Sequence, residues 1–371
     1  MYSIDQLDEK LKHVCHAFCI EGVYQSYEEI KVGNVNRTYK VNFLRDDGTP
    51  KSYVVQAVNT YVFKKPVEVM SNIDRVTEHI RSKKQGRIAL HFHHTKDRKT
   101  FLIDENGFWR LFNYIPSETH NVCHQLEIIR NAGEAFGEFQ MMLSDFSASE
   151  LYVTIPDFHD TRKRFATLWK DVEQDPLGKV REVTEELKWL KSAEENACVL
   201  TDLYNQGELP LRVTHNDTKI NNVLFEREGN QAIVVIDLDT VMPGLVGHDF
   251  GDAIRFAANH VAEDSPQYAS AGLDMDVFRA FAEGFLAHTA RTLTDREIET
   301  LPISCFVLTV ELATRFLDDY INGSPYFKIA YPEHNLVRTR CQIALAKDML
   351  KKMEAMTCII RECVQKIRGD A

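Results

Sequence analysis

Apolar and polar residues alternate in two neighbouring stretches near the amino terminus, 31–44 and 51–59, which are separated by the turn sequence DDGT. Large or apolar residues occupy every second position there: Tyr39, Val41, Phe43, Tyr53, Val55 and Ala57. A period of two is typical of strands with one buried face, and the turn between them favours antiparallel pairing. The pattern therefore predicts a β-hairpin.

A helical period follows directly. Residues 66–84 begin with Pro66, a residue favoured at the first helical position. The apolar residues then recur at spacings of four, three and four: Val69, Ile73, Val76 and Ile80. This pattern predicts an amphipathic helix inserted into the β-rich region.

Further strands are predicted at 87–94 and 101–115, on the two sides of a polar turn. His91 and His93 would share one face of the first strand, which also suggests a metal site. No carboxylate or thiol is close to them in sequence, so ordinary strand residues are the favoured interpretation.

Pro116 and Ser117 break the β pattern, and the sequence that follows is mainly helical. Helices are predicted at 123–143, 157–174 and 178–205. We therefore expect a β-rich lobe at 1–115, a mainly helical lobe at 116–371, and a hinge at 113–116.

Two short apolar runs, 223–225 and 232–236, interrupt the helical region, and the turn EREGN between them predicts a second hairpin. After Asp252 the pattern is helical to the end. A stripe of apolar residues near the carboxyl terminus repeats at four and three, which favours a core-facing helix over a coiled coil because it is short: Met349, Met353, Met356, Ile360, Cys363 and Ile367.

Composition restricts the function classes. The 371 residues carry a formal net charge of −11, which argues against a broad nucleic-acid surface. The charged amino terminus does not resemble a signal peptide, and no apolar run approaches the roughly 20 residues that span a bilayer, so we expect a cytoplasmic protein without membrane contact. The 8 cysteines show no zinc-like spacing and are expected to be reduced.

Candidate chemistry lies around the second hairpin, where residues 213–225 read VTHNDTKINNVLF. Asn222 precedes the first strand and Asp237 follows the second, so both belong to the open end of the hairpin. Asp217, five residues before Asn222, is expected at the same end. Two carboxylates and an amide oxygen suit Mg²⁺, which shares its coordination with phosphate oxygens. The alternative is a polar loop whose side chains cap its own backbone.

The spacing His215-x-Asp217-x-x-x-x-Asn222, with Asp237 after the next strand, resembles the catalytic and metal-binding loops of the aminoglycoside phosphotransferase-like kinases. The resemblance implies an α+β, protein-kinase-like bilobal fold and ATP as co-substrate. It implies Asp217 as catalytic base, Asn222 and Asp237 as Mg²⁺ ligands, and His215 and Asp239 as organisers of the loops.

The nucleotide side departs from the kinase pattern. The expected phosphate-covering loop near 32–38 has a single glycine, and the third strand carries Gln56 where many relatives have a basic residue. We expect Mg²⁺ or Arg37 to neutralise more of the triphosphate, since Glu68, Asp74 and Glu78 of the following helix have no cation at 56 to pair with. The candidate nucleotide-binding residues are Asn34, Asn36, Arg37, Gln56 and Tyr114.

Longer segments, including 53–66, 155–165 and 311–340, are similar to the N-acetylhexosamine 1-kinases. This similarity implies transfer of the γ-phosphate to the anomeric hydroxyl of N-acetylglucosamine or N-acetylgalactosamine, with Arg315 and Tyr326 binding the sugar beside Asp217. A salt bridge from Arg315 to Asp318 or Asp319 on its own helix is the structural alternative. Asp160 and Arg162 are weaker candidates, and Asp249 is expected to brace the catalytic loop.

Two other functions remain open. A kinase of the same fold would act on choline, an amino alcohol or an aminoglycoside, and would need an acidic, aromatic acceptor site. A non-catalytic nucleotide-binding protein is supported only by Gln56 and the glycine-poor loop, whereas Asp217, Asn222 and Asp237 favour an active enzyme.

Overall fold

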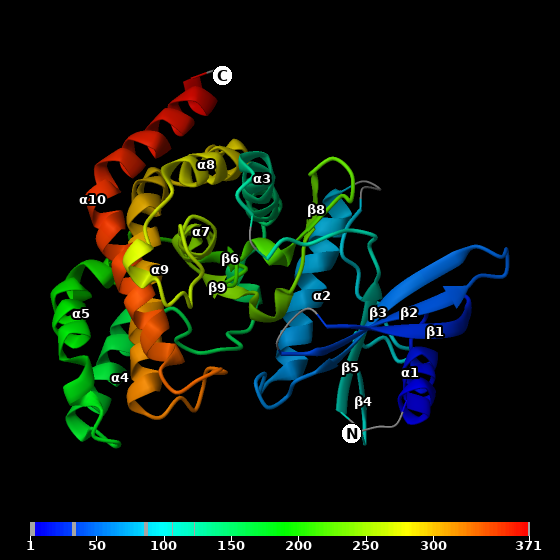
Figure 1. Cartoon of the computed structure of the whole chain (residues 1–371). Coiled ribbons are helices and arrows are strands. Elements are labelled where there is room, and N and C mark those ends of the chain that lie inside the picture. Colours follow the sequence, from blue (N-terminus) through cyan, green and yellow to red (C-terminus); the bar gives the residue numbers. More distant parts are fainter. Residues whose placement is uncertain (1–3, 32–34, 85–87, 106, 122, 370–371) are drawn as a thin grey trace.

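The computed structural model describes residues 4–31, 35–84, 88–105, 107–121 and 123–369. A small β-sheet with two helices forms the amino-terminal part, and a larger group of helices forms the carboxyl-terminal part (Figure 1). This arrangement confirms the predicted α+β class with a small β-rich lobe and a larger helical one.

The amino-terminal sheet has the strand order β1-β2-β3-β5-β4, and the neighbouring strands are antiparallel. Its strands are β1 (Val23–Ile30), β2 (Arg37–Leu44), β3 (Pro50–Val58), β4 (Leu102–Asp104) and β5 (Gly107–Asn113). The predicted hairpin is β2–β3, in which Val41 lies opposite Tyr53. Strand β1 was not predicted, because its polar residues leave most of its length exposed.

The two faces of this sheet have different neighbours. On one face, Tyr39, Val41 and Tyr53 pack against α1 (Ile4–Ala17), a helix that the sequence analysis did not predict. On the other face, Phe108 belongs to the core cluster that contains the apolar stripe of α2 (Pro66–Lys83), the predicted amphipathic helix. Figure 1 shows α2 between the sheet and the helical lobe.

The strand predicted at 87–94 is wrong. Within the described part of this segment, residues 88–94 run beside β5 but make only an isolated bridge between Phe92 and Phe112. The side chain of Asn113 accepts a hydrogen bond from the backbone amide of His91 at 2.7 Å. This amide is therefore not available for backbone pairing with β5. No group of three or more His, Cys, Asp or Glu side chains that suits a metal occurs among the described residues, so His91 and His93 form no such site.

Eight α-helices of the carboxyl-terminal lobe are described: α3 (Leu126–Met142), α4 (Thr161–Gln174), α5 (Thr184–Ala197), α6 (Val199–Asn205), α7 (Val246–Ala257), α8 (Met275–Thr289), α9 (Asp295–Ile321) and α10 (His334–Gly369). The predicted helices 123–143 and 157–174 correspond to α3 and α4. The predicted helix 178–205 is instead a 3₁₀ turn at Val180–Val183 followed by α5 and α6, which are interrupted at Cys198. Loops at 259–274 and 322–333 contain only a short 3₁₀ turn, Tyr268–Ser270, so the chain is not helical throughout after Asp252.

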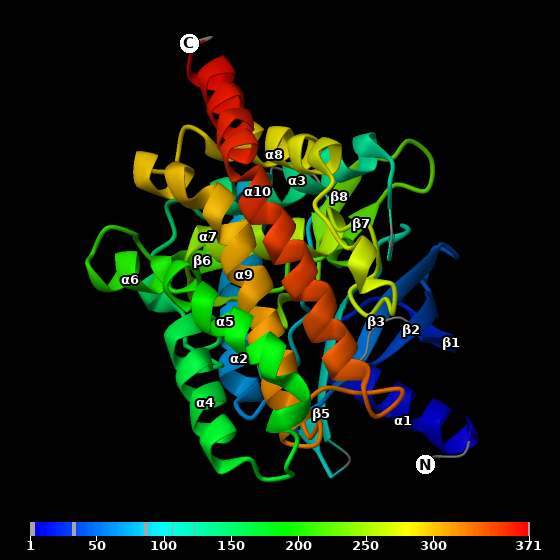
Figure 2. The ribbon, with the colours of Figure 1, turned by 60° about the vertical axis from the view of Figure 1, so that its left-hand side comes forward.

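Helix α9 forms the centre of this lobe and contacts α4, α5, α7 and α10 (Figure 2). It is long and apolar enough to span a membrane by length and composition, contrary to the expectation that no such segment exists, but 89% of its most apolar window is buried inside the protein. The stripe on α10 is also core: Met349, Met356 and Ile360 are buried, as predicted.

Of the eight cysteines, all of which are free, Cys15, Cys198, Cys305, Cys341 and Cys363 are buried.

Candidate active site

A second hairpin, β7 (Val223–Phe225) with β8 (Ala232–Val235), brings the predicted metal ligands together. Val223 lies opposite Val235, and the amide of Ile236 donates to the carbonyl oxygen of Asn222 at 2.8 Å. Asn222 and Asp237 are therefore neighbours at the open end of the hairpin, as the sequence predicts. The linker after β5 pairs with the same hairpin, because Glu118 and Phe225 exchange two backbone hydrogen bonds.

Asp217 lies beside Asn222. The side-chain amide of Asn222 donates to the backbone oxygen of Asp217 at 2.8 Å and to its carboxylate at 3.1 Å. This leaves the side-chain oxygen of Asn222 as a ligand for a cation. The other carboxylate oxygen of Asp217 lies 2.9 Å from the ammonium of Lys219. Burial alone lowers the pKa of Lys219, but Asp217 and Asp252 outweigh it and raise the pKa above its usual value.

Asp249 braces the backbone of this loop, as expected. Its two carboxylate oxygens accept hydrogen bonds from the backbone amides of His215 at 2.9 Å and Asn216 at 2.8 Å. Asn216 has a φ of +63°, which a short polar side chain tolerates better than most residues. Its amide group also binds the carbonyl oxygen of Thr240 at 3.0 Å. The loop is thus turned and fixed before Asp217.

His215 joins the two loops of the site. It is fully buried; its Nδ1 accepts from the amide of Asp217 at 3.3 Å, and its Nε2 lies 2.8 Å from the carbonyl oxygen of Ile236. With Nδ1 as acceptor, Nε2 carries the proton and donates a hydrogen bond to the carbonyl oxygen of Ile236, so the imidazole is neutral. The geometry fits the expected organising role.

Asp237 begins the turn Leu238–Thr240 with a left-handed φ of +59°. Burial, then the charges of Asp239 and Asp217, raise its pKa to about 6. The residue is nevertheless exposed to solvent, so protein surrounds the carboxylate without covering it. A solvent-open group of two carboxylates and an amide oxygen, with unfavourable charge repulsion, fits a divalent cation such as Mg²⁺.

Asp239 is committed to other partners. Both of its oxygens bind the guanidinium of Arg110 on β5, one of them at 3.0 Å, and the side-chain amide of Asn36 donates to it at 2.7 Å. Asp239 therefore fits the expected organising role.

The candidate nucleotide residues are not all gathered here. Gln56 on β3 accepts from Nε of Arg110 at 2.8 Å, and Tyr114 lies under the ammonium of Lys40, 5.1 Å from its ring centre. Arg37 points to the other face of the sheet, where its charge and a hydrogen bond act on the buried Tyr39, so the structure does not bring it to the site. Asn34 lies outside the described residues.

Arg315 and Tyr326, the candidate sugar-binding residues, lie together on the helical lobe. The guanidinium carbon of Arg315 is 6.0 Å from the ring centre of Tyr326, and it is also close to the rings of Phe158 and Phe327. The predicted alternative of a salt bridge to Asp318 or Asp319 is wrong, because the carboxylate nearest to Arg315 is Glu311, at 3.7 Å. Asp319 instead accepts the backbone amides of Tyr326 and Phe327, which holds Tyr326 in place.

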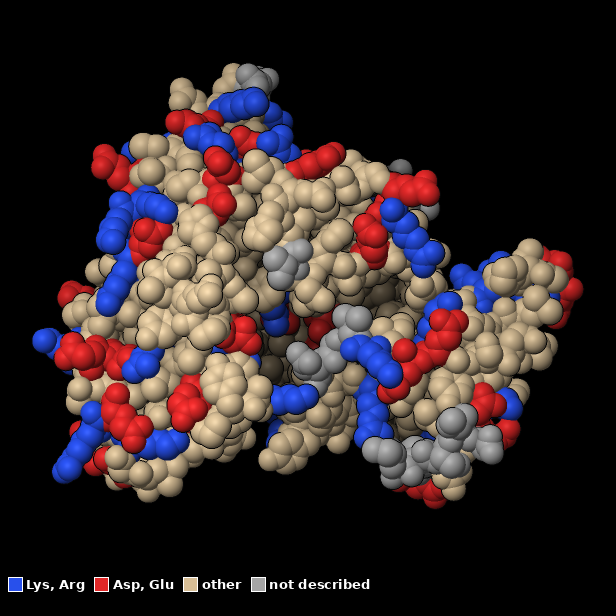
Figure 3. Space-filling model, in the orientation of Figure 1, with Lys and Arg blue, Asp and Glu red and all other residues tan. Residues whose placement is uncertain are grey.

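Glu311 belongs to a buried polar cluster that the sequence analysis missed. Its carboxylate lies 2.9 Å from Nδ1 of His159, and Arg164 is a second guanidinium nearby. Burial alone raises the pKa of Glu311, but His159, Arg315 and Arg164 outweigh it and lower the pKa to about 2. The ring of His159 is 4.8 Å from that of His248, the residue before Asp249, so this cluster adjoins the brace of the catalytic loop. Figure 3 shows charged side chains inside the hollow between the lobes.

Asp160 and Arg162 lie outside the site. Asp160 caps α4 by accepting from the amide of Lys163, and Arg162 pairs with Asp202 of α6. Both residues therefore stabilise helix ends and helix packing.

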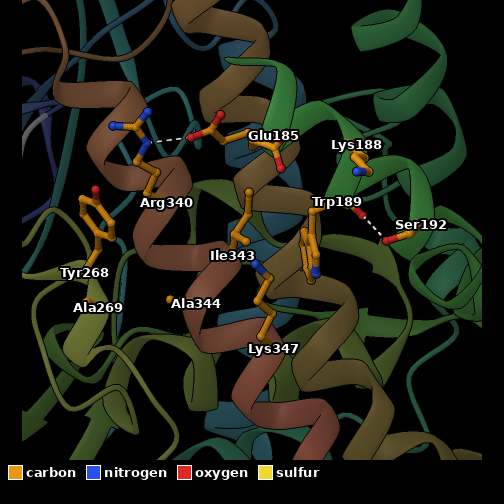
Figure 4. Close-up of a pocket in the computed structure, with 11 residues that line it drawn as sticks. Glu185, Lys188, Trp189, Ser192, Tyr268, Ala269, Arg340, Ile343, Ala344 and Lys347 are labelled. Atoms are coloured by element: carbon orange, nitrogen blue, oxygen red, sulfur yellow. Dashed lines mark hydrogen bonds and ion pairs between the residues drawn. The ribbon is translucent and has the colours of Figure 1, made fainter. Parts of the chain in front are cut away.

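A surface hollow of about 750 Å³ lies elsewhere, between α5, α10 and the Tyr268–Ser270 turn (Figure 4). It is an open groove with no candidate catalytic residue. Its arginine, Arg340, is paired with Glu186 at 2.6 Å, and Lys347 lies over the ring of Trp189. We do not assign the chemistry to this groove, because Asp217, Asn222 and Asp237 lie elsewhere.

Solved structures with the same fold cover most of the chain. The microcompartment-associated aminopropanol kinase aligns with a TM-score of 0.62 and 16% identity over 93% of this chain and 98% of its own. An aminoglycoside phosphotransferase from Alicyclobacillus acidocaldarius aligns with a TM-score of 0.59 and 12% identity over 95% of this chain and 96% of its own. The Plasmodium vivax ethanolamine kinase aligns with a TM-score of 0.55 and 13% identity over 85% of this chain and 82% of its own. At these identities the likeness shows the fold alone.

The sequence model of the phosphotransferase enzyme family, APH, matches residues 26–283. That range includes most of the sheet, the loop of Asp217, the second hairpin and most of α8. The chain belongs to the APH phosphotransferase family and is a small-molecule phosphotransferase of this kinase-like fold.

Proposed function

We propose that the protein transfers the γ-phosphate of ATP to the anomeric hydroxyl of N-acetylglucosamine or N-acetylgalactosamine. The observation that carries the proposal is the convergence of Asp217, Asn222 and Asp237, together with the guanidinium of Arg315 beside Tyr326. We propose the surroundings of Arg315 and Tyr326 as the acceptor region. The first feature supports phosphoryl transfer, and the second supports a neutral acceptor.

In the proposed reaction, the carboxylate of Asp217 accepts the proton of the acceptor hydroxyl while the hydroxyl oxygen attacks the γ-phosphorus. The bond from this phosphorus to the bridging oxygen breaks, ADP leaves, and the sugar 1-phosphate forms. The anomeric hydroxyl is the most acidic hydroxyl of a sugar, so a carboxylate suffices as the base. Lys219, 2.9 Å from Asp217, supplies positive charge next to the reacting oxygens.

Asn222 and Asp237 would hold Mg²⁺, which supplies charge neutralisation to the phosphate oxygens of ATP. His215 keeps these residues in register with Asp217, because it binds both the amide of Asp217 and the carbonyl of Ile236.

The charges in the acceptor region support an uncharged sugar. Arg315 and Arg164 both lie near the buried carboxylate of Glu311, and the pKa of Arg164 is lowered by burial and then by Arg315. Two guanidinium groups would repel the ammonium of choline or an amino alcohol, whereas Arg315 offers donors to an acetamide oxygen or ring hydroxyls. Tyr326 adds an apolar ring with a polar end for the face of the sugar.

An amino-alcohol acceptor remains the second candidate, because structures of the same fold carry the names aminopropanol kinase and ethanolamine kinase. An aromatic surface made by Phe158, Tyr326 and Phe327 also suits a cation in principle. In this protein, however, Arg315 lies near all three rings.

The test is ADP release with Mg²⁺, ATP and a panel of acceptors: N-acetylglucosamine, N-acetylgalactosamine, glucosamine, ethanolamine, choline and spectinomycin. Glucosamine is the matched control, since its free amine replaces the neutral acetamide with a cation. We expect turnover of the acetylated sugars and much slower turnover of glucosamine. Turnover of the amino alcohols alone would replace the proposal with its alternative.

Asp217→Asn is the control for mechanism. The substitution preserves shape but removes the base, so turnover should fall by about 10²–10⁴-fold while ATP binding persists. Retained turnover in this variant would contradict the role of Asp217.

A further inference from the structure

Arg110 is a charged residue in the buried middle of strand β5. It is 2% exposed, between the apolar residues Trp109 and Leu111. Its two terminal nitrogens bind the two carboxylate oxygens of Asp239, 129 residues further along the chain. A two-point arginine–carboxylate pair fixes orientation as well as distance, so the contact joins the sheet rigidly to the loop after Asp237.

The remaining partners of Arg110 explain Gln56. The Nε of Arg110 donates to the side-chain oxygen of Gln56 at 2.8 Å, and the amide of Gln56 donates to Thr38 at 3.0 Å. The two residues lie opposite each other in the β3–β5 pair. A lysine at 56 would place a second cation against the guanidinium, so a neutral residue there is a consequence of the arginine at 110.

Helix α2 offers Arg110 a methionine sulfur, that of Met70 at 3.8 Å, and none of its acids. Glu68 pairs with Lys65 at 3.0 Å, Glu78 lies 3.2 Å from His91, and Asp74 lies 3.6 Å from His94. The carboxylate partner of the buried sheet cation therefore comes from the other lobe, from the turn that carries Asp237.

We propose that Arg110 is a positioning residue of the magnesium–nucleotide site and acts through Asp239. Fixing Asp239 fixes the turn Leu238–Thr240 and thereby the direction of Asp237, which begins that turn in a left-handed conformation. Asn36, which binds Asp239 at 2.7 Å, connects the same carboxylate to the residues before β2. The inference rests on the proposed function for the identity of the ligand, but it does not depend on the acceptor.

Charge gives a second reason for this role. Asp217, Asp237 and Asp239 lie near one another, and Asp239 is 3% exposed. Without Arg110, its carboxylate would be a buried charge without an ionic partner, which strongly perturbs a loop. The turn would then relax toward solvent, and Asp237 would lose the orientation needed for a metal ligand.

The experiment measures the affinity of ADP and of a non-hydrolysable ATP analogue by calorimetry, once with Mg²⁺ and once with EDTA. Arg110→Met should weaken binding with Mg²⁺ by about 10- to 100-fold, because residues that orient metal ligands typically contribute that much. Binding in EDTA should change little, which a general loss of structure would not produce. Arg340→Met, which breaks the remote pair with Glu186, is the matched control and should bind as the wild type does.

A double-mutant cycle tests whether Arg110 acts through Asp239. Asp239→Asn should weaken magnesium-dependent nucleotide binding as Arg110→Met does. The double variant should bind little more weakly than either single variant, since both substitutions break the same ion pair. Asn36→Ala, a change at a half-buried position, should give a smaller loss of the same magnesium-dependent kind even if the arginine variant does not fold.

Two results would overturn the proposal: folded Arg110→Met binding Mg²⁺–nucleotide within about twofold of the wild type, or additive losses in the cycle. Failure of the proposed function looks different. If the wild type binds Mg²⁺–nucleotide but phosphorylates no acetylated sugar, the acceptor proposal fails and the role of Arg110 stands.

Discussion

Nε2 of His215 lies 2.8 Å from the carbonyl oxygen of Ile236, and this contact joins the loop of Asp217 to the short segment between β8 and Asp237. The same ring accepts the amide of Asp217 through its Nδ1. One buried, neutral imidazole therefore sets the distance between the proposed base and the proposed metal ligand.

We expect His215→Ala to lower kcat by about 10- to 100-fold, because a residue that orients catalytic groups contributes on that scale. The buried amide and carbonyl that lose their partner should also reduce the free energy of unfolding by about 1–3 kcal/mol. Steady-state kinetics and urea unfolding measure the two effects. His260→Ala, at an exposed histidine, should change neither. Unchanged kcat in His215→Ala would show that the two loops hold their geometry without it.

Gln56→Lys restores the basic residue that many kinases carry on the third strand, yet we expect it to impair this protein. The new ammonium would face the guanidinium of Arg110, which now lies 2.8 Å from the oxygen of Gln56. Loss of the hydrogen bond at a buried charged partner should cost about 1–3 kcal/mol in urea unfolding. Gln56→Glu is the matched change of opposite sign and should be tolerated better. Higher activity or stability in Gln56→Lys would contradict this explanation of the departure.

Arg315→Met should raise KM for the acceptor by about 10-fold or more while KM for ATP stays the same, since a charge-assisted hydrogen bond contributes about 1.5–3 kcal/mol. Methionine keeps much of the packing against Phe158 and Phe327 without the charge. If choline or ethanolamine became a substrate of the variant, repulsion by Arg315 would be supported directly. An unchanged acceptor KM would remove Arg315 from the binding site.

Asp318 provides a test of pH dependence. Burial, then the charge and hydrogen bond of Asp171, raise its pKa from 3.8 to about 7. Because its pKa is higher in the folded than in the unfolded state, Asp318 binds a proton more readily in the folded protein. The stability that this protonation contributes is fully present below pH 3.8 and is lost as the pH rises through about 7. Asp318→Asn, which is neutral at every pH, should therefore stabilise the protein at pH 8 more than at pH 5. Thermal unfolding at both values measures this difference, and equal shifts would contradict the raised pKa of Asp318.

The sequence predicts the β7–β8 hairpin well because two local signals coincide there. Short apolar runs flank a turn, and antiparallel pairing then brings Asn222 and Asp237 together. Asp217 is only five residues before Asn222 in the sequence, so it is expected at the same end of the hairpin. Each of these steps spans few residues, so the pattern alone determines the geometry.

Contacts between distant segments could not be predicted in the same way. The pair of Arg110 and Asp239 depends on how the two lobes meet, and an arginine within FWRLF was its only signal. The register of the strands decides which cation lies near Asp239. Arg37 lies on the same face of the sheet as Tyr39, the face that packs against α1, whereas Arg110 lies opposite Gln56. The acceptor region likewise joins α9 to residues far away, so Glu311 and Arg164 carried no signal as partners.

The break of the predicted helix 178–205 at Cys198 has a similar origin. The helical period continues through it, but the end of α5 and the start of α6 pack on different neighbours, since Leu190 and Leu200 belong to separate core clusters. Helix propensity does not record that change of direction.

The position of the phosphate in the product tests the central claim most directly. Wild-type protein is incubated with ATP, Mg²⁺ and N-acetylglucosamine or N-acetylgalactosamine, and the product is analysed by ³¹P–¹H correlation NMR, with Asp217→Asn in parallel. We predict a correlation from phosphorus to the anomeric proton in the wild-type reaction, and product formation that is slower by about 100-fold or more with the variant. Phosphate on another oxygen, product formation by Asp217→Asn at a rate near that of the wild type, or no sugar phosphate from a protein that binds Mg²⁺–ATP would contradict the account.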